Sequence, residues 1–284
     1  MRYIKLIFKV LLILLIPVVM QVVVTMGLAI QMAVKLAQSG TSQEFIEATL
    51  QNSIASKLTL IVGLASILTQ FIFFVASAAK GKSFTNDYTL KKISLKHIGL
   101  SIAVTLTGYM LSLGINGTFD MAAKDPKGAE AVAGLVMNMS FPTTLFIIGL
   151  VVPFVEEIVF RGAIMRNLKR HMPIAAVLVI QAALFGLYHM NLVQGFMAFF
   201  LGLNIGLAVY FSGSIWAGIL IHALNNSISV ILSRALPEDF DISKIGFILL
   251  LVIGLGLSVA IQSLFYKSKV EQPQVIEKEM IEAV

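Results

Sequence analysis

The chain has 284 residues, of which 58% are hydrophobic and 13% are charged, and its mean hydropathy is +0.91. These values exclude an ordinary soluble domain and indicate an integral membrane protein. The formal net charge of +6 is interpreted as a topology signal and as contact with anionic lipid, not as a nucleic-acid surface. The chain contains no cysteine, which excludes disulfides and thiolate chemistry.

Eight segments are apolar over roughly the 20 residues that a helix needs to cross the hydrocarbon core of a bilayer. They lack the alternating polar positions of a transmembrane β-barrel, so helices remain as the structure that satisfies the backbone in lipid. The predicted fold is therefore all-α, a polytopic membrane bundle of about eight transmembrane helices. The expected spans are Leu6–Met32, Leu58–Ala79, Ile98–Leu113, Thr143–Met165, Pro173–Met190, Val193–Phe211, Ile215–Leu232 and Ile245–Phe265.

Basic residues gather on alternate connections between these spans. One side carries most of them, including Lys92, Arg166 and Lys267, whereas the other side mixes a few lysines with acidic residues. Because basic loops stay on the cytoplasmic face, both termini are expected in the cytoplasm of a multi-pass cell-membrane protein. The first span follows basic residues as a signal sequence would, but it is too long for one and is interpreted as a retained span.

The spans differ in polar content, which predicts how the chain is organised. Ionisable residues at membrane depth are functional candidates, and they concentrate between about 140 and 235, whereas the first three spans hold almost none. We expect an N-terminal three-span region over 1–139, a catalytic core over 140–235 and a final span over 236–266. An acidic tail over 267–284 is expected to be disordered in the cytoplasm.

Two adjacent glutamates stand in one of the most apolar parts of the chain, within the run FVEEIVFRGAIM. Residues four apart share a helix face, whereas neighbours point about 100° apart. Glu157 is therefore expected to pair with Arg161 and to support the structure, because a pair in low dielectric costs far less than either charge alone. Glu156 has no partner on its own helix and is suited to act as a general base.

Polar side chains on later spans lie at matching depth. At a rise of about 1.5 Å per residue from a turn at Met172, Glu156 and His189 both lie roughly 25 Å along their helices. His222 and Asn226 are one turn apart on the seventh span. Side chains from three helices can thus converge inside the membrane, and the basic turn beside them predicts a site that opens toward the cytoplasm.

Three motifs occur in order on these spans. EEIVFR (Glu156–Arg161) fits EExxxR, FGLYH (Phe185–His189) fits FxxxH, and HALNN (His222–Asn226) fits HxxxN. Together they resemble the CPBP intramembrane proteases, also called the Abi or CAAX-protease family, whose eukaryotic relatives trim prenylated CaaX proteins. The resemblance extends over about residues 140–233, and the first hundred residues carry no diagnostic motif.

The resemblance implies an eight-helix endopeptidase that cleaves membrane-associated peptides or proteins. Glu156 and His189 would activate a water, and His222 and Asn226 would stabilise the oxyanion, roles that agree with the chemistry of these groups. Phe185 is expected to pack so that it positions His189.

Three alternatives stay open. The family was long labelled as metalloproteases, and Glu156, His189 and His222 could hold zinc; no cofactor is expected, because Asn226 serves better as a hydrogen-bond donor than as a zinc ligand and HExxH is absent. A non-catalytic bacteriocin-immunity or scaffold protein would use the bundle for interaction only. A proton-coupled transporter would also place Glu and His in spans, but it commonly shows internal repeats, which we do not find.

Overall fold

The structure is a computed structural model that describes residues 2–40, 42–237 and 242–270. Over these residues the chain is helical and contains no strand. Among the described residues, seven helical segments are long and apolar enough to cross a membrane, and one further apolar helix is shorter. The prediction of an all-α polytopic membrane bundle is confirmed. Most of the predicted tail, from residue 271 on, lies outside the described residues.

The spans agree with the predicted ones in order and approximate bounds. The fourth is a continuous helical segment over Phe141–Lys169, and the fifth is the short helix. The second span has the predicted ends, the fifth is shorter than predicted at both ends, and the remaining helices extend up to six residues beyond the predicted ends. The bounds are α1 Arg2–Gln38, α3 Leu58–Ala79, α5 Leu95–Phe119, α11 Ile174–Tyr188, α12 Leu192–Ser212, α13 Ile215–Ala235 and α14 Lys244–Lys267.

Several connections that the sequence analysis left unassigned are helical: α2 (Gln43–Ser56), α4 (Phe84–Asp87), α6 (Met121–Lys124) and α7 (Pro126–Met137). The start of α7 is held by Asp125. One carboxylate oxygen accepts from the Gly128 N–H at 2.9 Å, and the other accepts from the Leu192 N–H at 2.8 Å. This side chain therefore caps α7 and ties it to the beginning of α12.

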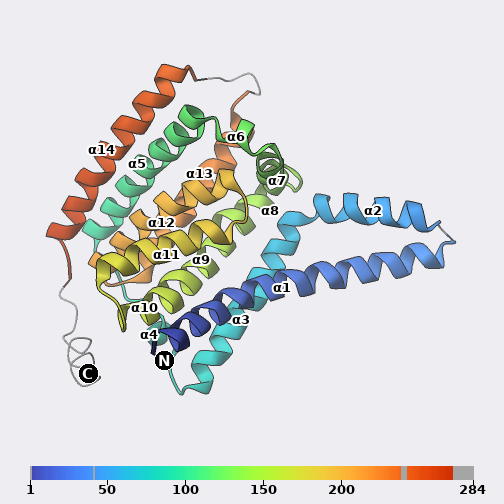
Figure 1. Cartoon of the computed structure of the whole chain (residues 1–284), viewed down its shortest axis with the longest axis horizontal. Coiled ribbons are helices and arrows are strands. Elements are labelled where there is room, and N and C mark those ends of the chain that lie inside the picture. Colours follow the sequence, from blue (N-terminus) through green and yellow to red (C-terminus); the bar gives the residue numbers. More distant parts are fainter. Residues whose placement is uncertain (1, 41, 238–241, 271–284) are drawn as a thin grey trace.

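The bundle has three parts side by side (Figure 1). The segment Phe141–Lys169 lies in the middle with α11, α12 and α13, while α5 and α14 cover one flank. On the other flank α1 and α3 pack together, and α1 with α2 reaches away from the bundle. At about 1.5 Å per residue, the 37 residues of α1 extend over about 55 Å, more than a bilayer's apolar core requires.

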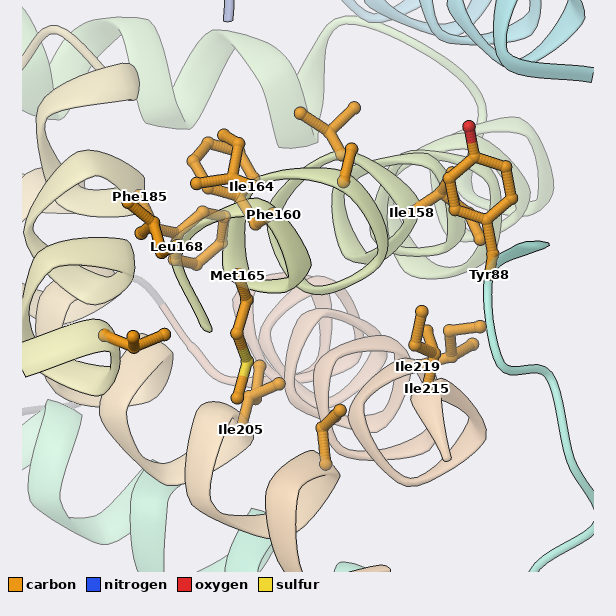
Figure 2. Packing of buried hydrophobic residues seen from close by; sticks show 14 of the residues in the cluster. Tyr88, Ile158, Phe160, Ile164, Met165, Leu168, Phe185, Ile205, Ile215 and Ile219 are labelled. Atoms are coloured by element: carbon orange, nitrogen blue, oxygen red, sulfur yellow. The ribbon is translucent and has the colours of Figure 1, made fainter. Parts of the chain in front are cut away.

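Buried apolar side chains fill the middle of the bundle (Figure 2). Phe160, Ile164 and Leu168 of the fourth span lie near Phe185 of α11, and Ile158 of the same span lies near Tyr88. By contrast, α1 and α14 expose many large apolar side chains. That is the pattern expected of outer helices that face lipid, where burial inside the protein is not needed to remove them from water.

Glycine brings α5 and α14 into close contact. A Cβ atom on Gly114 would lie 2.3 Å from the backbone nitrogen of Leu251, and one on Gly254 would lie 2.7 Å from that of Leu111. No side chain fits at either position. The two helices therefore pack backbone to backbone, the arrangement that small residues permit between membrane helices.

The positions of the basic loops predict the membrane orientation of the bundle. Lys92 and Lys127 are both exposed, and they lie near α4 and α7, at opposite ends of the bundle (Figure 1). We expect Lys92→Cys to be labelled by an impermeant maleimide only from the cytoplasm and Lys127→Cys only from outside. The absence of native cysteine makes the signal unambiguous, and labelling from the same side would refute the topology.

Candidate active site

The helix that carries the two glutamates changes its winding on both sides of them. π-Helical turns η1 (Ile147–Val151) and η2 (Ile158–Met165) flank the α-helical segment α9 (Val152–Glu157). The short helices α8 (Phe141–Phe146) and α10 (Arg166–Lys169) complete the fourth span. π-Helical turns are rare and are frequent at functional sites.

Pro153 explains how η1 is linked to another helix. In a π-helix the carbonyl of residue i accepts from the amide of residue i+5, as the Val152 N–H does with the Ile147 carbonyl. The corresponding donor for Ile148 would be Pro153, which has no N–H. The Ile148 carbonyl accepts instead from Asn226 Nδ2 at 3.1 Å. The proline thus leaves a backbone acceptor free, and that acceptor holds the α13 amide in place.

Glu157 and Arg161 form the pair that their spacing predicts. Arg161 Nη1 donates to Glu157 Oε1 at 2.9 Å, and both side chains are fully buried. The second guanidinium nitrogen donates to the Gly202 carbonyl at 3.1 Å, and the guanidinium lies 4.7 Å from the centre of the Phe185 ring. Gly218 leaves room for the carboxylate, since a Cβ there would lie 2.8 Å from Glu157 Oε2.

His222 lies between the two glutamates. Its Nδ1 is 2.9 Å from Glu157 Oε1, and its Nε2 is 3.6 Å from Glu156 Oε2. The imidazole is almost fully buried. The i,i+4 spacing predicts the Glu157–Arg161 pair but not the contact of Glu157 with His222. The spacing of Gly218 and His222, one turn apart on α13, is the signal that could have revealed it.

Phe185 lies between the two histidines. Its ring centre is 5.0 Å from that of His189 and 5.5 Å from that of His222, both in edge-to-face geometry. His189 ends α11, and its Nδ1 lies 2.9 Å from the Phe185 carbonyl oxygen. Because a carbonyl only accepts, Nδ1 carries the proton, and in the neutral ring Nε2 is left as an acceptor. Phe185 thus contacts both histidines as well as Arg161.

A cavity of about 260 Å³ lies beside these groups, and His189, His222 and Asn226 line it. It also has a polar wall. Four of the polar side chains there were not expected from the sequence, Tyr109, Ser112 and Asn116 of α5 and Ser229 of α13, and they lie with Gln194 of α12 and Asn225 of α13. The three α5 residues follow i, i+3, i+7 spacing, which places them on one helix face. That spacing was visible in the sequence, in a span that we took to lack functional residues.

Glu156 lines a second, smaller cavity of about 30 Å³, which α1 and α3 close from the other side. Gln21, Ser66 and Tyr188 also line it, together with Thr69. The Thr69 hydroxyl is buried and has no hydrogen-bond partner within the described part of the chain. The volume suffices for one water molecule, and the lining provides the polar partners that a buried water requires.

Part of the chain matches a known protein family. Residues 138–228 match the family described as "Type II CAAX prenyl endopeptidase Rce1-like". This segment belongs to the CAAX-protease family. The match covers about a third of the chain and includes every candidate site residue, so the resemblance stated from the three motifs is confirmed. No curated protein and no solved structure matches the chain.

The matched segment, residues 138–228, is called the CAAX-protease core below, and its family suggests a class of activity and of substrate. It indicates an intramembrane protease of CAAX type and a membrane-associated peptide or protein as substrate. Together with the apolar helices, it indicates a multi-pass membrane protein.

The residues of the CAAX-protease core do not fit the zinc site considered from the sequence. Within the described ranges, no three His, Cys, Asp or Glu side chains are grouped closely enough to hold a metal ion. Nδ1 of His222 faces Glu157 and Nδ1 of His189 faces a backbone carbonyl, so only the Nε2 atoms of these rings are left to contact a ligand.

The larger cavity reaches from mid-helix toward the end of the bundle that carries α6 and α7. It is lined by the second half of α5, the first half of α12 and the second half of α13. The basic residues of the α3–α5 connection and of α10 lie at the opposite end. The sequence predicts that the basic loops are cytoplasmic and that the site opens toward the cytoplasm. In the structure the basic loops and the larger cavity lie toward opposite ends of the bundle. Cysteine labelling at positions 92 and 127 shows which end is cytoplasmic.

The buried contacts predict different effects for the two glutamates on stability. Glu157→Gln removes the counter-charge of the buried Arg161 and the acceptor of His222, so we expect the free energy of unfolding to fall by about 3–5 kcal/mol. Glu156→Gln leaves Arg161 paired and alters only the longer contact of 3.6 Å with His222, so its thermal midpoint in detergent should stay close to that of the wild type. The assignment is wrong if Glu156→Gln is the less stable variant.

Proposed function

We propose that the chain is an intramembrane endopeptidase that hydrolyses peptide bonds of membrane-associated peptides or proteins, with Glu156 as the base and without a metal ion. The observation that carries this proposal is the continuous contact from Arg161 through Glu157 and His222 to Glu156. It lies beside a cavity that His189 and Asn226 line. A carboxylate base, an imidazole and an amide donor are the groups that such a hydrolysis would require.

The water that attacks the substrate would lie between Glu156 and His189. His189 Nε2, which is an acceptor when Nδ1 donates to the Phe185 carbonyl, takes one hydrogen bond from this water. Glu156 removes the other proton as the water oxygen bonds to the substrate carbonyl carbon. The small cavity beside Glu156, which His189 does not line, has room for a further water outside the larger cavity that the peptide would occupy.

The oxyanion formed in this step needs hydrogen-bond donors that stabilise its negative charge. Asn226 Nδ2 uses one hydrogen on the Ile148 carbonyl, and its second hydrogen is available to the oxyanion. His222 donates through Nε2 only if Nδ1, which faces the Glu157 carboxylate, also carries a proton. It then acts as an imidazolium between the two glutamates. Glu156 finally returns its proton to the leaving nitrogen as the C–N bond breaks, which completes the hydrolysis.

A comparison of cells that make the wild type or Glu156→Gln tests the activity. New peptide termini among membrane proteins should appear with the wild type and disappear with the variant. The same peptides, and a prenylated CaaX peptide as a first probe, should then be cleaved by the purified protein. A Glu156→Gln variant that keeps the cellular function would show that the protein acts as an immunity or scaffold protein.

The oxyanion assignment predicts the kinetics of two substitutions. His222→Ala and Asn226→Ala should each lower kcat by roughly a hundredfold to a thousandfold, with little change in KM, because the lost donor acts on charge that develops in the transition state. Asn225→Ala is the matched comparison, since it removes a neighbouring amide from the same cavity but not the bond to Ile148. A larger loss for Asn225→Ala would move the oxyanion role to that residue.

Metal analysis separates the glutamate mechanism from the zinc alternative. We expect purified active protein to contain substoichiometric zinc and to keep its activity after exhaustive chelation. In the zinc alternative, His222→Ala would lose a stoichiometric metal whereas Asn226→Ala would keep it. One zinc per chain, with activity lost on removal and restored by zinc alone, would refute the metal-free mechanism.

A further inference from the structure

A basic cavity lies at the end of the bundle where α1 begins, far from the active site. Its volume is about 410 Å³, and four cationic side chains line it, Arg2, Lys5 and Lys9 of α1 and Arg170 after α10. His171 completes the charged and titratable lining, and no described lining residue is acidic. The Arg2 guanidinium donates to the Arg170 carbonyl at 3.1 Å, which joins the two walls.

The cations of α1 lie beside the face that packs against the bundle. Arg2, Lys5 and Lys9 follow i, i+3, i+7 spacing and share a helix face. Leu6 lies between them in the sequence, lines the same cavity and is buried. Lysines that served only for solubility would be expected on the opposite face. The arrangement instead gathers like charges in one recess, where they repel each other.

Asp87, an acidic residue that pairs with cations outside the cavity lining, does not neutralise the cavity. Asp87 pairs with Lys80 at 3.4 Å and with Arg166 at 2.9 Å. Burial acts to raise the pKa of Asp87, but the hydrogen bond from Ser77 and the charges of Arg166 and Lys80 outweigh it, and the pKa lies below its usual value. Asp87 therefore stays ionised and bound to these cations, and Lys9 remains in the repulsive field of Arg170, Lys80 and Arg166.

We propose that this cavity binds the phosphate of an anionic phospholipid and thereby fastens the start of α1 to the turn after α10. A phosphate anion offers acceptors to several lysine and arginine donors at once and relieves their mutual repulsion. The apolar side chains Ile4, Ile7 and Phe8 are exposed on the other faces of the same turns of α1. They provide the surface along which acyl chains lie, a contact that free phosphate lacks.

Titration of the full-length protein in neutral detergent tests the site through its thermal midpoint, which rises when a ligand binds the folded state. The probes are short-chain phosphatidylglycerol, short-chain phosphatidylcholine and inorganic phosphate. We expect phosphatidylglycerol to raise the midpoint of the wild type at lower concentration than either of the other two. No effect of phosphatidylglycerol would overturn the proposal, and an equal effect of phosphate would identify a site for a soluble anion instead.

Matched variants separate this cavity from general surface charge. Lys5→Gln/Lys9→Gln/Arg170→Gln should weaken the response to phosphatidylglycerol by at least about tenfold, because each lost charge-assisted hydrogen bond is worth about a factor of ten or more. Lys91→Gln/Lys92→Gln/Lys96→Gln removes the same charge at the same end of the bundle, outside the cavity, and should respond as the wild type does. Equal losses in both variants would refute a specific site. If the first variant misfolds, Lys5→Gln alone decides, since this side chain is exposed.

Discussion

The carboxylate of Glu157 is the group on which the rest of the candidate site depends. It is fully buried in a chain that crosses a membrane, where an unpaired charge is too costly to keep. One of its oxygens meets both Arg161 and His222, so one anion holds side chains from two helices. The surrounding sequence accommodates it, because Gly218 leaves space for the carboxylate. A side chain that the sequence spacing predicts to be structural therefore also contacts a candidate catalytic histidine.

A second constraint comes from the backbone of the same span. Proline removes a donor inside a transmembrane helix, and the freed carbonyl must find a partner because lipid offers none. Here that partner is the amide of Asn226. The π-helical turns and Pro153 are thus part of how α13 is set against the fourth span. Both ends of the HxxxN motif are held by that span, His222 through Glu157 and Asn226 through the Ile148 carbonyl.

Different helices line the two cavities beside the candidate site. The larger cavity is walled by α5, α7, α12 and α13, whereas the smaller one, beside Glu156, is closed by α1 and α3. The first three spans, which carry no recognised motif, therefore contribute to both. α1 contacts the bundle along a narrow buried stripe that ends at Pro17, which lines the smaller cavity. Fixing the start of α1 by a lipid phosphate would stabilise this stripe at a distance from the chemistry.

The sequence by itself determined the membrane class, the order of the spans, the family of the core and the Glu157–Arg161 pair. These features depend on composition and on spacing along one helix, which the chain carries directly. Only the tertiary structure placed His222 between the two glutamates, joined Asn226 to Ile148 and brought the polar face of α5 to the cavity. Each of these depends on how neighbouring helices are rotated and shifted against one another. In a membrane, packing of small residues and buried hydrogen bonds sets that rotation, and hydropathy along the chain does not record it.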